Sequence, residues 1–207
     1  MLNYLNPFSY IKKMVEIFAI RHGKTQFNLK KKIMGHLDIH LDSKSIDEIK
    51  KVGNRLKGIN FDIIYSSDLK RASETGCIVR DIINKKMPLK FSKSLREIDY
   101  GILSGKHKYS VKREYPQYKK DASFVHPKGE SLEQAYKRVV KFINRISPRY
   151  NRVLLITHAG CIRAIFSYCS GQKLQENVGM KVANDVILKC TITKKEKRVK
   201  ILQNTIV

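Results

Sequence analysis

The sequence has no tryptophan, four cysteines and no long uninterrupted run of apolar residues. A helix that crosses a membrane needs about 18 consecutive apolar residues, so we expect no membrane span and no membrane partner. The cysteines form no C-x-x-C pair and are too few for a zinc ribbon or a disulfide scaffold. They lie in apolar or mixed segments, at Cys77, Cys161, Cys169 and Cys190. This pattern predicts buried thiols in a cytoplasmic protein.

Acidic residues are also scarce. Asp and Glu number 18 against 42 Lys and Arg, which gives a formal net charge of +24 at pH 7. A field of this sign attracts nucleic acids, acidic membranes and phosphorylated metabolites. The basic residues are scattered, and the sequence has no aromatic-and-basic RNA-binding motif and no zinc finger. The charge therefore favours compositional drift or an anionic substrate over a nucleic-acid partner, and it does not indicate an oligomeric state.

The chain has 207 residues and is 42% hydrophobic, which suits one domain with a sizeable core. Residues 1–13 lack the order of a secretory signal, so we expect an irregular N-terminal extension and then one domain over 14–207. Apolar runs predict strands that alternate with amphipathic helices. The strands are expected at about 15–20, 61–65, 152–157, 182–193 and 198–203, and the helices at about 45–58, 68–84, 131–146 and 159–168. This alternation predicts a three-layer α/β fold, a doubly wound and mostly parallel sheet with helices on both faces.

Residues that cap helices stand at several of the predicted boundaries. Ser45 with Glu48 and Ser131 with Gln134 have the spacing of a capping box, in which cap and third helical residue bond each other's backbone. Gly58 is expected to end the first of these helices. Residues 66–68 are expected to cap the helix that follows the second strand.

Basic side chains follow three of the predicted buried strands. Arg21 and His22 come directly after the first strand, and His158 comes directly after the third. Arg71 lies in the first helical turn after the second strand. Ligands in open α/β sheets bind beyond the carboxyl ends of the strands, so we expect these side chains to meet. Two histidines and two arginines at one edge would form an anion site with a potential nucleophile.

Each of the two histidines is followed within two residues by a glycine, Gly23 or Gly160. A lone histidine is more often structural than catalytic, but two in the same local setting favour chemistry. We expect the glycines to let the backbone turn sharply and approach a ligand closely. The helix after His158 would add the partial positive charge of its N-terminus.

The segment RHGKT at 21–25 matches the R-H-G-x-[ST] signature of the histidine phosphatase superfamily, which includes the cofactor-dependent phosphoglycerate mutases. Four further blocks follow in the family's order: YSSDLKRA at 65–72, EIDYGILSG at 97–105, PKGES at 127–131 and LLITHAGCIR at 154–163. From Met14 onward, the chain therefore resembles this superfamily. The resemblance implies an enzyme with a phosphoglycerate mutase-like fold.

The resemblance also implies a role for each matching residue. His22 resembles the nucleophile, whose neutral imidazole attacks phosphorus and forms a phosphohistidine. Arg21, Arg71 and His158 resemble the clamp on the phosphoryl oxygens. Glu97 resembles the general acid that protonates the leaving alcohol and then the base that activates water. No metal and no other cofactor is implied, because arginine and histidine supply the positive charge.

Two further residues are expected to bind the substrate. Asn28 matches an asparagine that follows the family signature, and Lys24 stands where the signature commonly has glutamate. Two alternatives stay open. Asp99 is the rival of Glu97 as the acid, and Asn28 is a candidate to stabilise the local turn together with Thr25.

The segment expected over the pocket bears on the reaction. The family's mutases typically carry extra cover there and a C-terminal tail, whereas here 22 residues separate Lys106 from Gly129 and the chain ends soon after two plain strands. Short cover admits water, so the resemblance implies a metal-independent phosphatase. Its substrate is expected to be a small anionic phosphorylated metabolite, of the phosphoserine or α-ribazole-phosphate type. The alternatives are a phosphoglycerate mutase and a non-catalytic relative that binds phosphorylated ligands. Lysines over 102–128, with Lys24, predict a second negative charge on the substrate.

Overall fold

The computed structural model describes residues 14–203, so the extension expected over 1–13 lies outside the described residues. The strands are β1 (Met14–Arg21), β2 (Ile63–Ser66), β3 (Leu89–Phe91), β4 (Arg152–Thr157), β5 (Ile187–Thr193) and β6 (Lys197–Gln203). The α-helices are α1 (Gln26–Leu29), α2 (Ile46–Leu56), α3 (Lys70–Asn84), α4 (Lys108–Glu114), α5 (Leu132–Ile146) and α6 (Ala159–Ser170). Short 3-10 helices are η1 (Ser43–Ser45), η2 (Lys93–Leu95), η3 (Gly101–Leu103) and η4 (Leu174–Asn177).

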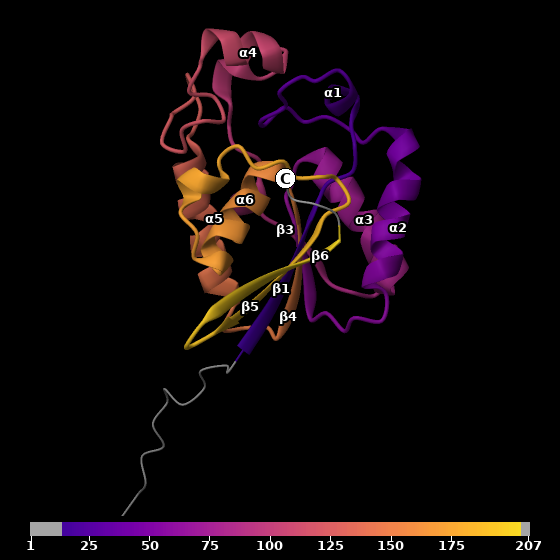
Figure 1. Ribbon diagram of the computed structural model, residues 1–207. Helices are drawn as coiled ribbons and strands as arrows, with labels where there is room; N and C mark the ends of the chain where they lie inside the picture. Colours follow the sequence, from indigo (N-terminus) through magenta and orange to yellow (C-terminus); the bar gives the residue numbers. More distant parts are fainter. Residues whose placement is uncertain (1–13, 204–207) are drawn as a thin grey trace, which may run out of the picture.

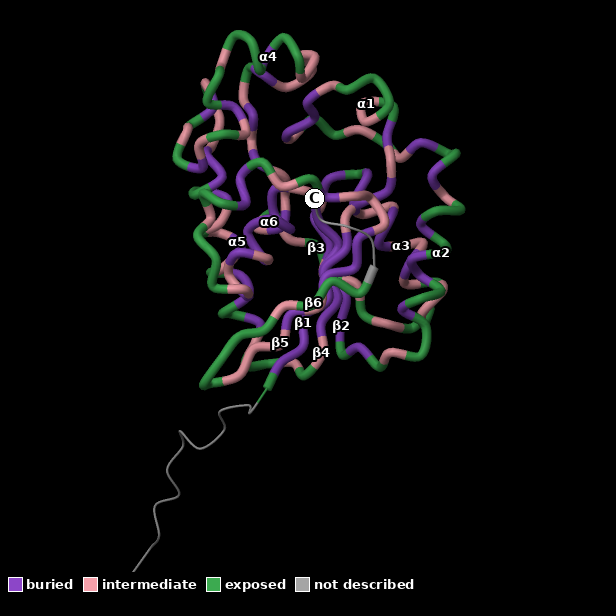
Figure 2. The backbone as a smooth tube through the Cα atoms, in the orientation of Figure 1, coloured by how far each residue is buried: buried purple, intermediate pink, exposed green. Residues whose placement is uncertain are grey.

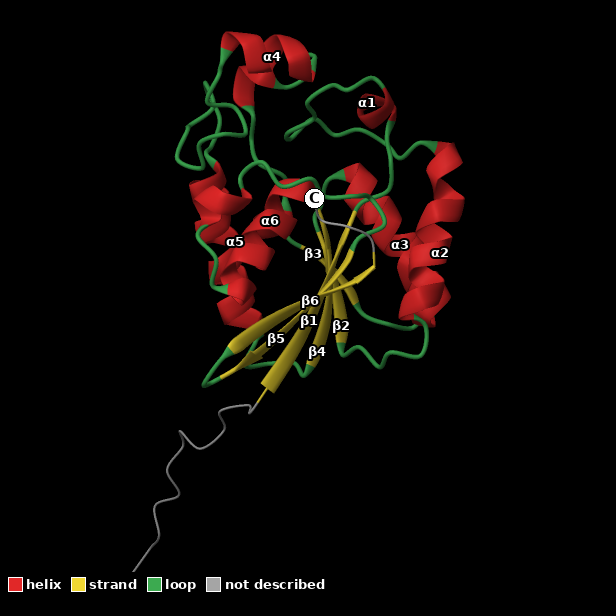
Figure 3. Ribbon diagram, viewed as in Figure 1, coloured by secondary structure: helices red, strands yellow, loops and turns green. Residues whose placement is uncertain are grey.

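Within residues 14–203, the six strands form a single sheet in the order β3-β2-β4-β1-β5-β6 (Figure 3). The first four strands along the chain pair in parallel, whereas β5 runs antiparallel to β1 and β6 runs antiparallel to β5. Helices α5 and α6 cover one face of the sheet, and α2 and α3 cover the other (Figure 1). The predicted three-layer α/β fold is confirmed.

The alternation of side chains along the central strands builds two cores. Successive residues of a strand point to opposite faces of the sheet. In β1, Ile17 packs in the cluster formed with α5 and α6, whereas Phe18 and Ile20 pack in the cluster formed with α2 and α3. Because helices cover both faces, both sets of positions are apolar, and the strand appears in the sequence as a continuous apolar run.

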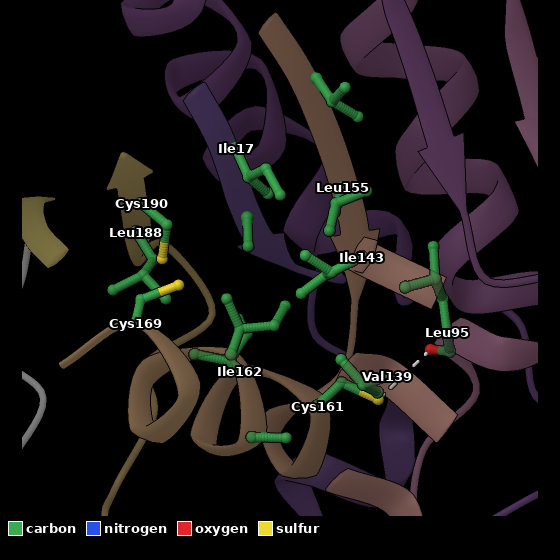
Figure 4. Packing of buried hydrophobic residues seen from close by; sticks show 14 of the residues in the cluster. Ile17, Leu95, Val139, Ile143, Leu155, Cys161, Ile162, Cys169, Leu188 and Cys190 are labelled. Atoms are coloured by element: carbon green, nitrogen blue, oxygen red, sulfur yellow. Dashed lines mark hydrogen bonds between the residues drawn. The ribbon is translucent and has the colours of Figure 1, made fainter. Parts of the chain in front are cut away.

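The core on the α5–α6 face shows how this packing is achieved (Figure 4). Ile17 and Leu155 of the sheet share one cluster with Val139 and Ile143, one turn apart on α5, and with Ile162 of α6. All five side chains are fully buried, and each contributes roughly 1.5–3 kcal/mol of hydrophobic stabilisation. The apolar face predicted for this helix is confirmed.

The same cluster contains three of the four cysteines. Cys161, Cys169 and Cys190 are buried and free, as predicted, and the Cys161 thiol donates to the Leu95 carbonyl (Figure 4). Cys77 is free but only half-buried, so for this thiol the prediction of burial is wrong. It lies on α3 at the border of an apolar surface cavity.

The capping prediction is confirmed for α5 and wrong for α2. Ser131 and Gln134 make both bonds of a capping box. The Ser45 hydroxyl instead donates to the Asp42 carbonyl at 2.7 Å and makes no helix-capping bond. The reason is that the 3-10 helix η1 leads directly into α2. The backbone is therefore already helical at Ser45, where the cap was expected. Gly58, two residues beyond the end of α2, has a φ of +84°, a conformation suited to glycine.

Residues 66–68 do not cap α3 as predicted. The cap position is Leu69, which has no side-chain cap bond. The Ser67 hydroxyl contacts His158, and Asp68 forms an ion pair of 2.6 Å with Arg96. The polar groups of this turn are therefore used in tertiary contacts.

Two strand predictions also differ from the structure. The strand expected at 182–193 begins at Ile187, and residues 182–186 form a loop that contacts the site described below. Strand β3 was not predicted, because three residues at a sheet edge are too few for a recognisable pattern. Within residues 14–203, no helix has the length and apolarity needed to cross a membrane.

A third, smaller core lies beyond the carboxyl ends of the parallel strands. Ile98, Leu103, Val111 and Tyr118 belong to it, and it supports the segment that carries α4. Buried residues concentrate along the strands, whereas much of α4 is exposed (Figure 2). This segment stands over the sheet edge at which the predicted site lies (Figure 1).

Candidate active site

Strand register places His22 and His158 side by side. β1 and β4 pair in parallel with Arg21 opposite Thr157, so both strands end at the same level. The His22 amide donates to the Thr157 carbonyl at 2.9 Å, and the two imidazole centroids lie 5.0 Å apart. The His22 residue is 1% exposed and His158 is 0% exposed. The expected meeting of the two histidines is confirmed.

The His22 ring has a defined proton arrangement. Its Nδ1 lies 2.7 Å from the Gly23 carbonyl oxygen, which can only accept, so Nδ1 carries the proton. Burial, with Arg71 and Arg21 close by, holds the pKa of His22 well below its usual value. The ring is therefore neutral at pH 7, and Nε2 carries a lone pair, as a nucleophile requires.

The His158 ring is oriented by Ser67, from the turn after β2. His158 Nε2 lies 2.9 Å from the Ser67 hydroxyl, whose oxygen accepts from the Leu69 amide at 3.3 Å. The hydroxyl can donate its proton to Nε2, and in that arrangement the ring proton is on Nδ1. Burial, followed by the charge of Arg71, lowers the pKa of His158 well below its usual value. A neutral His158 can therefore still donate a hydrogen bond through Nδ1.

Backbone carbonyls fix the two arginines. The fully buried Arg71 donates through Nη1 to Leu37 at 2.7 Å and through Nη2 to Gly35 at 2.8 Å. Arg21 donates through Nη1 to Val182 in the 182–186 loop at 2.5 Å. Burial lowers the pKa of each arginine to about 10, and Glu97 opposes this shift. Both guanidinium groups remain charged at pH 7.

Unpartnered nitrogens identify what these residues could bind. Across residues 14–203, three buried side-chain nitrogen atoms lack a hydrogen-bond partner: Arg21 Nε, Arg71 Nε and His158 Nδ1. Buried polar groups in proteins are normally bonded. All three atoms belong to residues of this site, where two carry positive charge, so the arrangement suits an anion with several oxygen atoms.

Glu97 joins the site from the segment after η2. Its Oε1 accepts from the Ile98 amide and from the Gly160 amide, both at 2.9 Å. Its backbone carbonyl accepts from Arg138 at 2.8 Å. Arg21 and Glu97 line the same cleft, together with Ala159 at the start of α6. A half-buried carboxyl group at this position can exchange a proton with a molecule in the cleft.

The two glycines serve close packing within the protein, and neither has a positive φ. A Cβ atom at Gly160 would stand 2.4 Å from Glu97 Oε1, and one at Gly23 would stand 2.4 Å from Ile49 Cδ1. Neither glycine therefore uses the left-handed backbone conformation that favours glycine. What they provide is space for neighbouring side chains.

Asp99 has a structural position. Its Oδ1 accepts from the Gly101 amide at 2.9 Å, and it lies 3.6 Å from His36 Nδ1. Asp99 is also not among the residues that line the cleft with Glu97. The geometry favours Glu97 as the acid.

Asn28 and Lys24 lie in different places. Asn28 lines the cleft, and its Oδ1 accepts from the Thr25 amide at 3.0 Å in a capping box, so it also stabilises the turn. Lys24 pairs with Glu48 at 2.7 Å and borders a separate cavity of about 440 Å³. Lys24 does not line the cleft that holds Glu97, so the structure does not support the expectation that Lys24 faces a substrate bound there.

Several contributors to this site were not predicted. Arg163 lines the cleft from α6. It stands four residues after Ala159, so both residues lie on the same face of the helix. That spacing is visible in the sequence and could have identified Arg163. Asn184 donates to the His22 carbonyl at 2.7 Å, from a loop that the sequence suggested was strand. Tyr118 also lines the cleft, and only the tertiary fold brings it there.

The sequence profile described as "Histidine phosphatase superfamily (branch 1)" matches residues 17–205. Phosphoglycerate mutase-like protein 4 of Arabidopsis thaliana is 33% identical over 160 residues, which cover 73% of this chain and 69% of the plant protein. A 2,3-bisphosphoglycerate-dependent phosphoglycerate mutase of Methylorubrum populi is 29% identical over 180 residues, covering 81% of this chain and 85% of that protein.

Among solved structures, the α-ribazole phosphatase of Shigella flexneri superposes with a TM-score of 0.80 at 23% identity. The match covers 92% of this chain and 96% of that structure. At this level of identity the likeness establishes the fold. A protein named as a phosphoglycerate mutase is thus similar to this chain in sequence, and one named as a phosphatase is similar to it in fold.

Proposed function

Because the chain belongs to the histidine phosphatase superfamily, we propose that it hydrolyses phosphomonoesters through a phosphohistidine formed on His22. One observation carries the proposal. His22 is neutral, with its Nδ1 bound to a carbonyl and its Nε2 available, beside three buried nitrogens that have no partner within residues 14–203. A nucleophile and an anion clamp at one point are what phosphoryl transfer needs.

In the first step, the lone pair of His22 Nε2 attacks phosphorus and the bond from phosphorus to the leaving oxygen breaks. The carboxyl group of Glu97 gives its proton to that oxygen, so the alcohol leaves neutral. The arginines and His158 stabilise the negative charge on the equatorial oxygens. Preorganised donors of this kind require no rearrangement as the charge develops.

In the second step, the Glu97 carboxylate takes a proton from water while the water oxygen attacks phosphorus. The bond from phosphorus to Nε2 breaks, which releases inorganic phosphate and restores neutral His22. The two steps use the same carboxyl group as acid and then as base, and the chain's own residues supply all of the charge. No metal ion takes part in the proposed steps.

Hydrolysis is favoured over return of the phosphoryl group by the cover of the cleft. The 22 residues between Lys106 and Gly129 contain one helix of seven residues, α4. Glu97 is half-buried at the cleft that this segment borders, so water can reach the group that activates it. The substrate is proposed to be a small anionic phosphorylated metabolite, such as phosphoserine or α-ribazole phosphate, and the protein is proposed to act in the cytoplasm.

The test is hydrolysis of p-nitrophenyl phosphate in EDTA by the wild type and by His22→Ala, with circular dichroism to check folding. We expect turnover that resists EDTA and is abolished in the variant. When a reaction with radiolabelled substrate is quenched, the wild-type protein should carry a base-stable label. A panel of natural phosphomonoesters then ranks substrates.

Two results would contradict this function. Turnover that persists in folded His22→Ala would assign the chemistry to another group. A labelled but non-hydrolysing enzyme that interconverts phosphoglycerates would be a mutase, the function named for its relative in Methylorubrum populi.

A further inference from the structure

Residues 34–38, in the loop between α1 and η1, contact both the arginine clamp and the proposed acid. Arg71 donates to the carbonyls of Gly35 at 2.8 Å and Leu37 at 2.7 Å, the two neighbours of His36. The His36 ring contacts Glu97 instead, with Nε2 lying 2.8 Å from the Glu97 carbonyl oxygen. One short segment therefore joins two groups that phosphoryl transfer must use together.

Residues on both sides of His36 are anchored. Gly35, directly before it, has a φ of +51°, and a Cβ atom there would stand 2.7 Å from Ser104 Oγ. Two residues after His36, Asp38 Oδ1 accepts from the Lys70 amide at 2.7 Å, at the start of α3. The backbone therefore holds the His36 ring at a fixed place beside the proposed acid.

The His36 ring is a donor to Glu97. A carbonyl oxygen can only accept, so the proton lies on Nε2. The other nitrogen, Nδ1, lies 3.6 Å from Asp99 Oδ2. The ring is 30% exposed and His36 does not line the cleft that holds Glu97. Any effect of His36 on the chemistry must therefore pass through Glu97.

The bond from His36 acts on the peptide unit that holds the carboxyl group. The Glu97 carbonyl and the Ile98 amide belong to this one planar unit. The Ile98 amide donates to Glu97 Oε1 at 2.9 Å, and the Gly160 amide donates to the same oxygen at 2.9 Å. Orienting the carbonyl therefore orients the Ile98 amide, which in turn orients the carboxyl group. Because both amides bind Oε1, Oε2 is the oxygen available to exchange a proton with the substrate.

Arg138 binds the same carbonyl through Nη2, at 2.8 Å. One hydrogen bond is enough to satisfy a carbonyl group, so the second donor adds a restraint on its orientation. Loss of the His36 donor would leave the Glu97 carbonyl bonded to Arg138 and free to tilt. The expected consequence is a misplaced carboxyl group in a folded protein.

We propose that His36 is a positioning residue for Glu97. It orients the peptide unit between Glu97 and Ile98, and so holds the carboxyl group where it protonates the leaving oxygen and then takes a proton from water. This inference rests on the proposed function and adds a residue that no step of the reaction contacts.

His36→Leu tests the proposal, because it removes the donor and keeps a bulky side chain. On glycerol 2-phosphate, whose leaving oxygen needs a proton, we expect kcat/KM to fall about tenfold, the upper range for one hydrogen bond. On p-nitrophenyl phosphate, whose leaving group needs little protonation, kcat/KM should change less than about twofold, the level of a surface change. There kcat and KM should fall together, about tenfold, and phosphohistidine should accumulate, because the misplaced carboxylate still has to activate water in the second step.

Two polar variants separate the position of the donor from its polarity. The side-chain amide of His36→Gln can take the place of Nε2 and bind the same carbonyl, whereas that of His36→Asn is shorter and reaches only the place of Nδ1. We expect His36→Gln to keep kcat/KM on glycerol 2-phosphate within about twofold of the wild type, and His36→Asn to resemble His36→Leu. If His36→Leu does not fold, this comparison carries the test.

His40→Leu is the matched control. His40 lies in the same loop and binds Glu74 instead of Glu97. Inhibition by inorganic phosphate should be unchanged in every His36 variant, because backbone carbonyls, and not the His36 ring, hold Arg71. Equal losses on the two substrates, or weaker phosphate inhibition, would indicate general loosening of the site and overturn the proposal. A His36→Gln variant as impaired as His36→Asn would also overturn it.

A measurement without turnover separates this proposal from the proposed hydrolysis. The Ile98 and Gly160 amides both bind Glu97 Oε1, so their ¹H and ¹⁵N chemical shifts report the position of the carboxyl group. We expect His36→Leu to move both signals and His36→Gln to leave them near their wild-type positions. This result in a protein that hydrolyses nothing would refute the hydrolase and retain the positioning role. Unmoved signals in His36→Leu would refute the positioning role whatever the enzyme hydrolyses.

Discussion

The backbone amide of Gly160 donates a hydrogen bond of 2.9 Å to Oε1 of Glu97, and a Cβ atom at residue 160 would lie 2.4 Å from that oxygen. The same hypothetical Cβ would lie 2.7 Å from Ile98 Cγ1. The carboxyl position therefore depends on the absence of a side chain at the first turn of α6. Residue 160 controls the geometry of the proposed acid without containing a reactive group.

Gly160→Ala should disable the acid more than it harms the fold. Glu97 must move, so we expect kcat on an alkyl phosphate to fall by about 100-fold, the lower range for loss of general acid catalysis. The loss should be smaller on p-nitrophenyl phosphate, whose leaving group needs little protonation. Gly76→Ala on α3 is the control, because a Cβ there meets only ordinary contacts at 3.4 Å. Equal losses on both substrates would argue against the role of Glu97.

Ser67→Ala should release His158 from its orientation. The variant removes the hydroxyl 2.9 Å from Nε2, so the ring proton is no longer directed to Nδ1. We expect about a tenfold loss in kcat/KM and a similarly weaker inhibition by inorganic phosphate, corresponding to one hydrogen bond to a charged group. Ser73→Ala, which removes a hydroxyl bound to the Lys70 carbonyl, is the control. Unchanged phosphate inhibition would contradict the proposed proton arrangement.

Stability should decline in mild acid because of the buried histidines. The folded-state pKa of His22 and of His158 lies well below the ordinary value, so the unfolded chain binds more protons below about pH 6.5. The free energy of unfolding should therefore fall as pH decreases from 6.5, by up to about 1.4 kcal/mol per pH unit for each histidine. Urea unfolding at several pH values measures the slope. In His22→Gln the slope should be smaller, and an unchanged slope would show that this ring does not titrate as inferred.

Arg138 should act as a positioning residue for Glu97. It pairs with Glu130 at 2.6 Å and donates to the Glu97 carbonyl at 2.8 Å. Arg138→Met leaves the Glu130 carboxylate largely buried without its partner, so we expect a loss of about 2 kcal/mol in unfolding free energy, with reduced activity. Lys50→Met removes an exposed ion pair at 3.4 Å and should cost less than about 0.5 kcal/mol. Equal effects of the two substitutions would contradict this role.

The sequence predicted the parts of this site that local pattern determines. The buried strands before His22 and His158 are continuous apolar runs, and parallel register then places both residues at one edge. The α5 helix, from its capping box to its buried face, was predicted for the same reason. Where local propensity and tertiary packing agree, the sequence pattern is sufficient to predict the element and its buried face.

The remaining features depend on contacts between segments far apart in the chain. Ser45 has the spacing of a cap, yet its hydroxyl bonds a carbonyl three residues earlier. Lys24 lies two residues after the signature histidine, yet its ammonium pairs with Glu48 on α2. The bond from His36 to the Glu97 carbonyl joins two irregular segments, neither of which has a periodic signal. These features could not be derived from one sequence by pattern.

The two turns that carry His22 and Ser67 are extensions of the central ladder of the sheet. The His22 amide bonds the Thr157 carbonyl and the Ser67 amide bonds the Ile156 carbonyl, both at 2.9 Å, so the turns continue the pairing of β1 and β2 with β4. We expect these two amides to exchange with solvent as slowly as those of the buried strands that they continue. Thermal inactivation and loss of folded structure should therefore follow one curve, and a partly melted molecule that keeps its shape but has lost its reactivity should not accumulate on heating.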